Sequence, residues 1–347
     1  MARFPFPCNS RPLGYSDSRM TDLSVSVHVV GVGLNATDTL IRLPHFPAFD
    51  SKVEFLSADV LPGGQVASAM VACAAWGLRA RYVGKVGDDH AAQMQLAELT
   101  RAGVESHLIS VPHCTSQTAY ILVDEKTGER TILWRRDLRL ALRPEELQRE
   151  WIVTAGALHV DGHDTAAATQ AARWAREDGK PVFADVDNLY PGVEDLLASV
   201  DYLIASRDFP AKLTGEPDLA KSLPAILQRF GCRLVGVTLG RQGALAWDGS
   251  RFLPCPGYEV AAVDTTGAGD IFHGAFVYAT LEEWPFERVL EFSCAAAALN
   301  CTALGARGGI KPILEIERLM REGRRTAKPG DIGVPERAPA TAKRASK

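Results

Sequence analysis

The 347-residue sequence lacks the features that mark several classes of protein. Its seven cysteines are scattered and include no Cys-x-x-Cys pair, so a disulfide framework is not indicated. No segment approaches the roughly 18 apolar residues that span a bilayer, and the N-terminus has no apolar signal core. Lysine plus arginine (38) nearly balances aspartate plus glutamate (42), which argues against a nucleic-acid surface. We therefore expect a cytoplasmic protein with reduced thiols.

The length of the chain allows one large α/β domain or two smaller ones. Hydrophobic residues make up 46% of the chain and charged residues 23%, the proportions of an ordinary globular protein. Both ends are rich in proline and basic residues and lack a hydrophobic period. We therefore expect tails at residues 1–24 and 323–347, an ordered body over residues 25–322, and an alternative start at Met20.

Short β-branched runs alternate with longer alanine-rich segments of helical period along this body. The alternation predicts βα units on a mostly parallel central sheet, and hence a three-layer α/β/α domain. The expected strands are Val27–Val32, Arg81–Val86, Ala157–Val160, Pro181–Val186, Tyr202–Ala205 and Leu234–Leu239. The expected helices are Gln65–Trp76, Ala91–Ala102, Thr165–Asp178 and Leu219–Phe230.

Two regions break this rhythm. Lys52–Leu61 is a lone extended segment, and Gln117–Trp134 has the pattern of a hairpin that turns at Lys126-Thr127-Gly128. We expect these regions to form a small β-sheet lid, built from about residues 37–61 and 115–136, on the large domain.

The segment Asp264–Asp270, with the sequence DTTGAGD, is the most informative motif. Its glycines let backbone amides converge, and Asp270 opens an amphipathic helix. The start of a helix offers unpaired N–H groups and a positive dipole end, which suit a phosphate. A carboxylate beside that site can accept the proton of a substrate hydroxyl during phosphoryl transfer. The alternative is that Asp270 only caps the helix after a glycine turn.

This motif resembles the C-terminal signature of the ribokinase-like sugar kinases of the phosphofructokinase B type. The resemblance covers nearly the whole ordered body. It includes Gly31–Leu40, Pro62–Gln65, Tyr82–Asp89, Val237–Ala244 and Ala297–Gly309. The family implies a ribokinase-like fold, in which a nine-stranded central sheet lies between helices and a β lid covers the sugar.

The resemblance also implies an activity, the transfer of the γ-phosphoryl group of ATP to a sugar hydroxyl with Mg²⁺ on the phosphates. Asp270 would be the catalytic base. The amides of the anion hole would be those of Gly267, Ala268 and Gly269. Activation by K⁺ is common in the family, at a site that Asp264 and Thr266 would match here.

The same resemblance assigns the residues that hold the two substrates. The sugar would be bound by Asp38, Gly63, Gly64, Gln65, Asp161 and Asp270. The nucleotide would be bound by Thr238, Gly240, Gly243, Thr265, Gly267, Gly269, Ala298 and Cys301. Lid strands often pair between subunits in this family, so a homodimer through the lid is expected.

The sequence departs from the family pattern at two places. In the double-glycine loop, Gln65 and Ser68 stand where asparagine is usual, although a longer amide can still bond a sugar. Ser206–Phe209 replaces the Asn-x-x-Glu motif, so phosphate-ion activation and the usual magnesium-water shell are not carried over. The loss of that motif is similar to ketohexokinase and sulfofructose kinase, and Ala297–Pro312 resembles the sulfofructose kinase end of the family. The identity of the sugar stays open.

Two alternatives in other functional classes are open. Gly31–Ala36 fits the GxGxxA fingerprint of dinucleotide-binding proteins, with Glu54 at the right spacing. Pro44 and Pro47, however, break the helix that an NAD-dependent oxidoreductase needs after that turn. The second alternative is a non-catalytic sugar or nucleotide sensor that has kept the kinase fold.

Polar residues near two expected strand ends have open roles. His159, Asp161, His163 and Asp164 cluster as the ligands of a metallohydrolase would, but no second cluster completes such a site. His163 and Asp164 are instead expected to start and cap the next helix. Asp185 and Asp187 follow another strand, where they would approach magnesium through water or cap a loop.

Two cationic or titratable residues near the motif are assigned by default to packing or solvent. His273, one turn after Asp270, would either orient the phosphates or pack as a neighbour within the helix layer. Arg307 is expected to be a solvated loop arginine, with an approach to the phosphates as the alternative.

Overall fold

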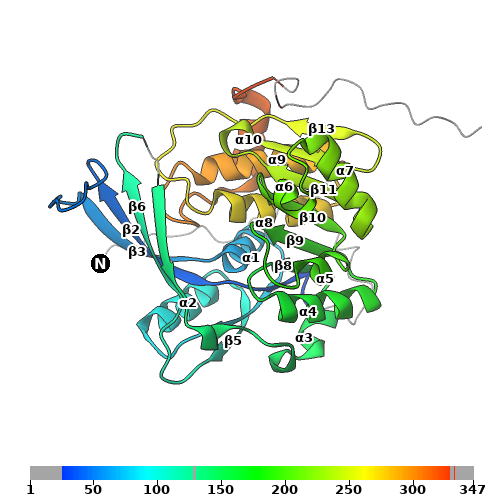
Figure 1. The fold of residues 1–347 in the computed structure, drawn as a ribbon, viewed down its shortest axis with the longest axis horizontal. Coiled ribbons are helices and arrows are strands. Elements are labelled where there is room, and N and C mark those ends of the chain that lie inside the picture. Colours follow the sequence, from blue (N-terminus) through cyan, green and yellow to red (C-terminus); the bar gives the residue numbers. More distant parts are fainter. Residues whose placement is uncertain (1–25, 128–129, 329–331, 333–347) are drawn as a thin grey trace, which may run out of the picture.

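The computed structural model describes residues 26–127, 130–328 and 332, which form a large α/β unit and a smaller β-sheet at its side (Figure 1). The expected N-terminal tail, with Met20, lies outside the described residues. All six expected strands and all four expected helices are present, with boundaries within two residues of the prediction. The three-layer α/β/α fold with a β lid is therefore confirmed.

The large sheet has nine strands in the order β13-β12-β11-β10-β9-β8-β1-β4-β5. Neighbouring strands are parallel from β11 to β5, and only β12 and β13 are antiparallel to their neighbours. All four residues of β1 are buried, as expected for a strand covered by helices on both faces. The strands are β1 (Val29–Val32), β4 (Ala80–Val86), β5 (Glu105–Ser110), β8 (Leu158–Asp161), β9 (Val182–Val186), β10 (Tyr202–Ser206), β11 (Leu234–Thr238), β12 (Ala244–Trp247) and β13 (Phe252–Cys255).

Two hydrophobic cores lie on the two faces of this sheet. Alternate residues of one strand enter different cores: Val29 belongs to the core that contains residues of α1, α8 and α9, whereas Val30 belongs to the core that contains residues of α4 and α7. The described helices are α1 (Gln65–Ala75), α2 (His90–Arg101), α3 (Arg149–Val153), α4 (Thr165–Glu177), α5 (Val193–Leu197), α6 (Phe209–Thr214), α7 (Leu219–Phe230), α8 (Ala268–Leu281), α9 (Phe286–Asn300) and α10 (Ile313–Glu322). Among the residues described, none of these helices has the length and apolar character needed to cross a bilayer.

The lid is a four-stranded sheet in the order β3-β2-β6-β7. Its strands are β2 (Ala36–Leu43), β3 (Ser57–Gly63), β6 (Thr118–Asp124) and β7 (Arg130–Arg135). The extended segment expected from Lys52 begins as a strand only at Ser57. The β2–β3 pairing ends at Arg42 with Ser57, and Pro44 cannot donate a ladder hydrogen bond beyond it.

The chain stays attached to the large unit beyond residue 322, where a tail was expected. Arg325 forms an isolated bridge with Tyr258, its guanidinium lies 3.8 Å from the centre of that ring, and it pairs with Glu291. The hydroxyl of Thr326 donates to the carbonyl of Arg241 at 2.8 Å. The expected boundary at residue 322 is therefore too early, because the cation and the aromatic ring fix the chain at least as far as Thr326.

Candidate active site

The DTTGAGD motif, Asp264–Asp270, forms the turn that leads into α8, which we name the catalytic turn for its expected role. Gly267 precedes the helix with a φ of 73°, and a Cβ there would lie 2.3 Å from the carbonyl oxygen of Ala306. Only glycine fits both the left-handed backbone and this close approach. Farther along α8, a Cβ on Gly274 would lie 2.8 Å from the carbonyl oxygen of Ala69 in α1. This tight packing fixes the helix that carries Asp270 in its first turn.

The Asp270 side chain lies partly buried at the positive end of α8. Its pKa is raised to about 7, mainly by burial and also by the negative charges of Asp185 and Asp38, while His273 and Arg307 oppose the shift. A carboxylate whose pKa lies near neutrality is matched to the removal of a hydroxyl proton at physiological pH. This geometry suits a general base, and the start of α8 suits an anion.

The predicted anion-hole residues differ in how open they are. A Cβ on Gly269 would meet no heavy atom within 4 Å, so the backbone there faces open space. The Ala268 amide, by contrast, donates to the carbonyl of Thr265 at 3.3 Å. That long bond would have to be exchanged for one to a phosphate before Ala268 could contribute.

Asp264 organises the turn before α8. It is 1% exposed, and it accepts the amide and hydroxyl of Thr266 at 2.9 and 2.7 Å and the amide of Gly305 at 2.8 Å. The carboxylate thus ties the motif to the loop that follows α9. Three of its roughly four lone-pair positions are used.

Asp38 lies on β2, which pairs with β3, the lid strand that ends at Gly63 in the double-glycine turn. A Cβ on Gly63 would lie 2.0 Å from Asp38 Oδ2, and a Cβ on Gly64, whose φ is 94°, would lie 2.3 Å from Asn35 Cα. The two glycines therefore let the turn pass directly beside the carboxylate. Burial raises the pKa of Asp38 to about 6, with Arg307 lowering it and Asp264 raising it.

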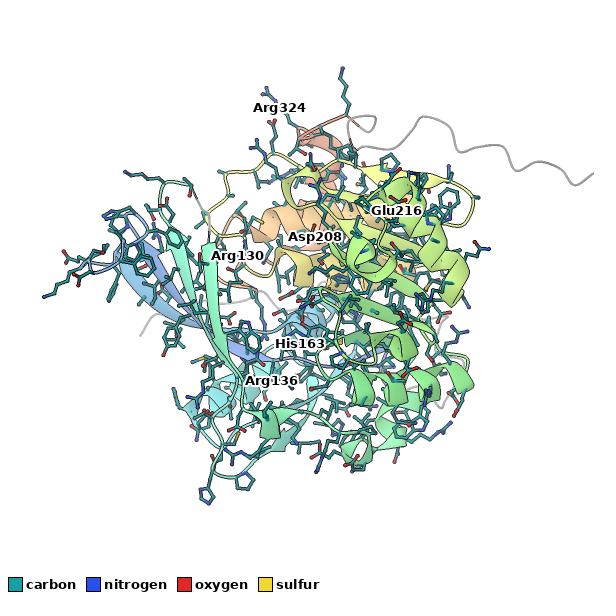
Figure 2. The ribbon with its side chains drawn as sticks, viewed as in Figure 1. Arg130, Arg136, His163, Asp208, Glu216 and Arg324 are labelled. Carbon is teal, nitrogen blue, oxygen red and sulfur yellow. The ribbon has the colours of Figure 1, made fainter. Side chains whose placement is uncertain are left out.

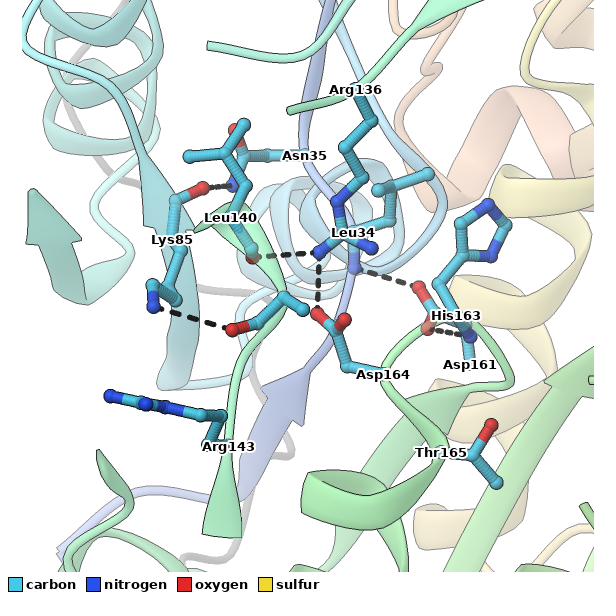
Figure 3. Close-up of polar contacts among 12 residues, drawn as sticks. Leu34, Asn35, Lys85, Arg136, Leu140, Arg143, Asp161, His163, Asp164 and Thr165 are labelled. Carbon is cyan, nitrogen blue, oxygen red and sulfur yellow. Dashed lines mark hydrogen bonds and ion pairs between the residues drawn. The ribbon is translucent and has the colours of Figure 1, made fainter. Parts of the chain in front are cut away.

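Gln65 and Asp161 have different hydrogen-bonding states. The Oε1 atom of Gln65, at the start of α1, is buried and has no partner among the described residues. This oxygen can accept a hydrogen bond from a donor such as a sugar hydroxyl. Asp161, at the end of β8, accepts the Leu34 amide at 2.7 Å and the His163 amide at 3.0 Å (Figure 3). Burial raises the pKa of Asp161 to about 6, and the carboxylate holds the loop after β1 in place.

His273 and Asp185 form a buried pair whose charges act on Asp270. His273 Nε2 is 3.2 Å from Asp185 Oδ1, and the ring centre of His159 is 5.7 Å from that of His273. Burial lowers the pKa of His159 to about 3, so this ring is neutral. His273 is therefore fixed by packing and by Asp185, which agrees with the second of the two roles expected from the sequence. Asp185 also adds negative charge that acts on Asp270.

Arg307 was expected to be solvated, and that expectation is wrong. It is 9% exposed; its Nη2 donates to the Gly63 carbonyl at 2.8 Å and its Nε to Ser68 Oγ at 3.1 Å. Burial lowers its pKa to about 10, yet it stays charged. Its glycine-rich sequence context resembles an exposed loop. Nothing local signals that the loop folds onto the double-glycine turn at Gly63 and Gly64, which we name the acceptor turn for its expected role.

The two ends of β7 contact the large unit (Figure 2). At one end Arg130 donates to the hydroxyl of Thr265 in the catalytic turn. Just beyond the other end, Arg136 Nη2 pairs with Asp164 Oδ2 at 2.7 Å (Figure 3). Asp164 occupies the N-cap position of α4 but makes no side-chain cap bond, so its expected capping role is wrong: its carboxylate pairs with Arg136 instead.

The residues assigned to the nucleotide lie on two sides of the motif. Thr238 ends β11, Gly240 opens a short turn after it, and Gly243 has a φ of 98° just before β12. Ala298 lies near the end of α9, and the carbonyl of Cys301 accepts the amides of Val263 and Asp264 at 2.7 and 3.2 Å. The end of α9 therefore lies directly against the catalytic turn.

The dinucleotide fingerprint leads into a strand, not a helix. Ala36–Leu43 forms β2 of the lid, so Gly31–Ala36 has no following helix to receive a pyrophosphate. The context that an NAD-dependent oxidoreductase requires is therefore missing at this motif.

Comparison with known proteins decides the family. The sequence pattern of the pfkB family carbohydrate kinases matches residues 28–313. The chain belongs to this family. Members of the pfkB family are phosphotransferases that use an alcohol group as acceptor.

Named relatives within the pfkB family are similar over most of their length. An ATP-dependent ribose-1-phosphate kinase of Halopiger xanaduensis is 31% identical over 81% of this chain and 94% of its own. A ribokinase of Bacillus subtilis is 27% identical over 83% of this chain and 98% of its own. The crystal structure of a ribokinase from Thermotoga maritima has a TM-score of 0.72 and 25% identity, covering 85% of this chain and all of that one.

Proposed function

We propose that this protein phosphorylates a sugar hydroxyl with ATP and that Asp270 is the catalytic base. The observation that carries the proposal is the placement of a carboxylate with a pKa of about 7 in the first turn of α8, beside the open backbone of Gly269. The family membership and the kinase names of the relatives support it. The assigned sugar and nucleotide residues are part of the same proposal.

The proposed reaction is a single in-line transfer. The acceptor hydroxyl gives its proton to Asp270 as its oxygen bonds to the γ-phosphorus, and the bond from that phosphorus to the β,γ-bridging oxygen breaks, leaving ADP. Asp38, Gln65 and the amide of Gly64 would orient the sugar. The amides at the start of α8 would stabilise the charge on the transferring group.

Magnesium would neutralise the phosphate charge when it is bound with ATP. Asp185 would approach the ion through water, because it lies near the end of β9 and its charge acts on Asp270. For K⁺ we propose Asp264 and the carbonyl of Thr266, an oxygen donor set of the kind that hard cations prefer. Asp264 has one lone-pair position left for such an ion.

Replacement of Asp270 by asparagine tests the proposed base. D270N should lose about 10²–10⁴-fold in kcat, the range that general bases contribute, while its affinity for ATP stays close to that of the wild type. A coupled ADP assay across ketoses, aldoses and nucleosides measures this. E282Q, just past the opposite end of α8, is the matched control. Wild-type kcat in D270N would refute the mechanism, and sugar binding without ADP release by the wild type would favour a sensor.

Stability provides an independent check that D270N is folded. The pKa of Asp270 is raised from 3.8 to about 7, so the native state prefers the neutral acid, and the stability this gives is lost as pH rises through 7. Asparagine keeps the neutral form. At pH 8 the free energy of unfolding of D270N should therefore exceed that of the wild type by about 1–3 kcal/mol in a urea titration. This difference in free energy should decrease as pH falls toward 4.

We further propose a homodimer through the lid and a cytoplasmic location. Val60, Tyr120 and Leu133 form a register row with Thr39 on one face of the lid and are each more than half exposed. Such a row of apolar side chains supports a contact with a second copy. The free thiols of the described cysteines suit a reducing compartment. Light scattering at micromolar concentration tests the dimer.

A further inference from the structure

The lid strand β7 has two faces, and the sheet register identifies what lies on each. Trp134 pairs with Ala119 on β6, Ala119 pairs with Asp38 on β2, and Asp38 pairs with Leu61 on β3. Paired residues project from the same face of a sheet. Trp134 therefore shares a face with the proposed sugar ligand Asp38. Ile132, two residues before it, is on this face as well.

Two contacts show that this face of the lid is turned toward the catalytic turn. Ala119 and Ile121 of the same face are buried and pack with Leu304, in the loop after α9. Arg130 is also on this face, two residues before Ile132, and it donates to the hydroxyl of Thr265. The face that carries Trp134 is therefore the inner face of the lid.

The segment from Arg130 to Arg136 spans the acceptor site from one side to the other. Its first residue contacts the catalytic turn, and its last pairs with Asp164 just beyond Asp161 at the end of β8 (Figures 2 and 3). Ile132 and Trp134 lie between these two attachment points. They are placed over the acceptor site and not at a remote edge of the lid.

The two apolar side chains between the attachment points are open to solvent. Trp134 is 64% exposed and Ile132 46% exposed, whereas Ala119 and Ile121 beside them on β6 are 5% and 2% exposed. The indole is apolar surface that is exposed to solvent on the inner face of the lid, next to the polar groups proposed to bind the sugar. A ligand can bury such a surface. The neighbouring residues on this face are already covered by the protein.

The spacing of the strands limits what can cover Trp134. Strands β2 and β7 are separated by β6, so the backbones of Asp38 and Trp134 lie about 9–10 Å apart, two inter-strand spacings. That separation exceeds the width of one sugar ring. A group that reaches the indole while the sugar hydroxyls stay on Asp38 must extend from the sugar toward β7.

We propose that Trp134 and Ile132 form an apolar subsite that binds a planar, apolar or aromatic substituent on the sugar acceptor. The inference rests on the proposed sugar kinase function and adds a substrate class to it. The indole stacks on the planar group, and Ile132 packs against its edge. Selectivity for substituted sugars over free ones arises at this subsite, apart from the hydroxyl contacts of Asp38 and the chemistry at Asp270.

Matched acceptors that differ only in the substituent test this subsite. Aryl and methyl glycosides of the same pentoses and hexoses, the free sugars, nucleosides and a pentose 1-phosphate are compared in a coupled ADP assay. The wild type should show a KM about tenfold lower for aryl than for methyl acceptors, as expected for one aromatic contact together with its buried area. W134A should abolish that ratio with little change in kcat, and W134F should keep most of it.

The controls separate the subsite from other effects of the lid. L133A changes the residue between Ile132 and Trp134, whose side chain is also exposed but lies on the outer face of the lid. This variant should leave the ratio of the aryl and methyl KM values unchanged. An equal KM for aryl and methyl acceptors, a ratio that survives in W134A, or a preference for the pentose 1-phosphate with exclusion of aryl groups would overturn the subsite.

A binding measurement distinguishes failure of the subsite from failure of the proposed function. If the wild type releases no ADP with any acceptor, the kinase proposal fails. Titration of D270N with the aryl and methyl glycosides, followed by tryptophan fluorescence and compared with the D270N/W134F double variant, still reports the subsite. Quenching by the aryl glycoside that requires Trp134 supports it, and equal quenching in both variants contradicts it.

Discussion

Replacing Arg307 by methionine tests whether one buried cation tunes the acidic site. Arg307 holds the acceptor turn through Gly63 and Ser68, and its charge lowers the pKa values of Asp38 and Asp270. Methionine has a similar length but no charge and no donor. R307M should therefore change the pH dependence, the sugar KM and the stability together.

The size of the pH shift follows from the electrostatics. At an effective dielectric constant of about 20, two unit charges interact by about 4 kcal/mol at a separation of about 4 Å and by about half of that at twice the separation, and about 1.4 kcal/mol corresponds to one pKa unit. Removal of the cation raises the pKa of Asp270, which must be ionised to act as a base. The acid limb of the kcat/KM profile should therefore move to higher pH, by about 0.5–1.5 units.

The loss of stability is set by the two hydrogen bonds. Each bond from a charged donor contributes about 1.5–3 kcal/mol, and part of this is offset because a buried cation no longer has to be desolvated. We expect a net loss of about 2–4 kcal/mol in the free energy of unfolding. R307K keeps the charge but not the two-pronged geometry, so its acid limb should stay close to that of the wild type while the sugar KM rises.

The assay is a pH profile of kcat/KM from pH 5.5 to 9, paired with urea unfolding. R101M is the matched control. Arg101 pairs with Glu98, a carboxylate whose charge also acts on Arg307, but the Arg101 side chain is 67% exposed. Its acid limb should not move. An R307M variant that loses stability but keeps the wild-type acid limb would refute the electrostatic role of Arg307. An acid limb that moves to lower pH would mean that Arg307 raises the pKa of Asp270, which is the opposite of the expected direction.

Two further predictions follow from the geometry of the site. G267A should lose at least about tenfold in kcat and about 1–3 kcal/mol in the free energy of unfolding, because the new Cβ would lie 2.3 Å from the Ala306 carbonyl oxygen and the φ is 73°. G269A is the control, because its Cβ would face open space. It should stay as stable as the wild type in the same urea titration. D185N removes a negative charge that raises the pKa of Asp270, so its acid limb should move to lower pH; a shift to higher pH would contradict the assignment.

The fold and the catalytic turn could be predicted from the sequence because their signals are local. The period-2 and helical patterns locate each βα unit, and DTTGAGD places a glycine turn and a carboxylate at one helix start. The second glycine of Pro62–Gln65 obeys the same kind of local constraint, because the φ of 94° at Gly64 restricts the residue type in the sequence itself. Asp38, by contrast, was expected from the resemblance of Gly31–Leu40 to the family and not from a backbone requirement.

Contacts between distant segments could not be predicted in this way. Arg307 lies 244 positions from its partner Gly63, and an arginine between glycines has the local pattern of a solvated loop. Asp164 has the sequence position of a helix cap, but an arginine 28 positions earlier takes its carboxylate. Which long-range partner wins depends on how the lid and the large unit are arranged, and no short pattern encodes that arrangement.

The acidic residues of the site form a coupled set that the acceptor itself would adjust. The pKa of Asp38 is raised by burial, and its charge in turn raises the pKa of Asp270. A sugar hydroxyl that donates to Asp38 favours the ionised form of that carboxylate. Ionised Asp38 increases the proton affinity of Asp270, and a base of higher proton affinity removes the acceptor proton more readily. Binding of the sugar to Asp38 would therefore make ionised Asp270 a stronger base and move the acid limb of the bound enzyme to higher pH.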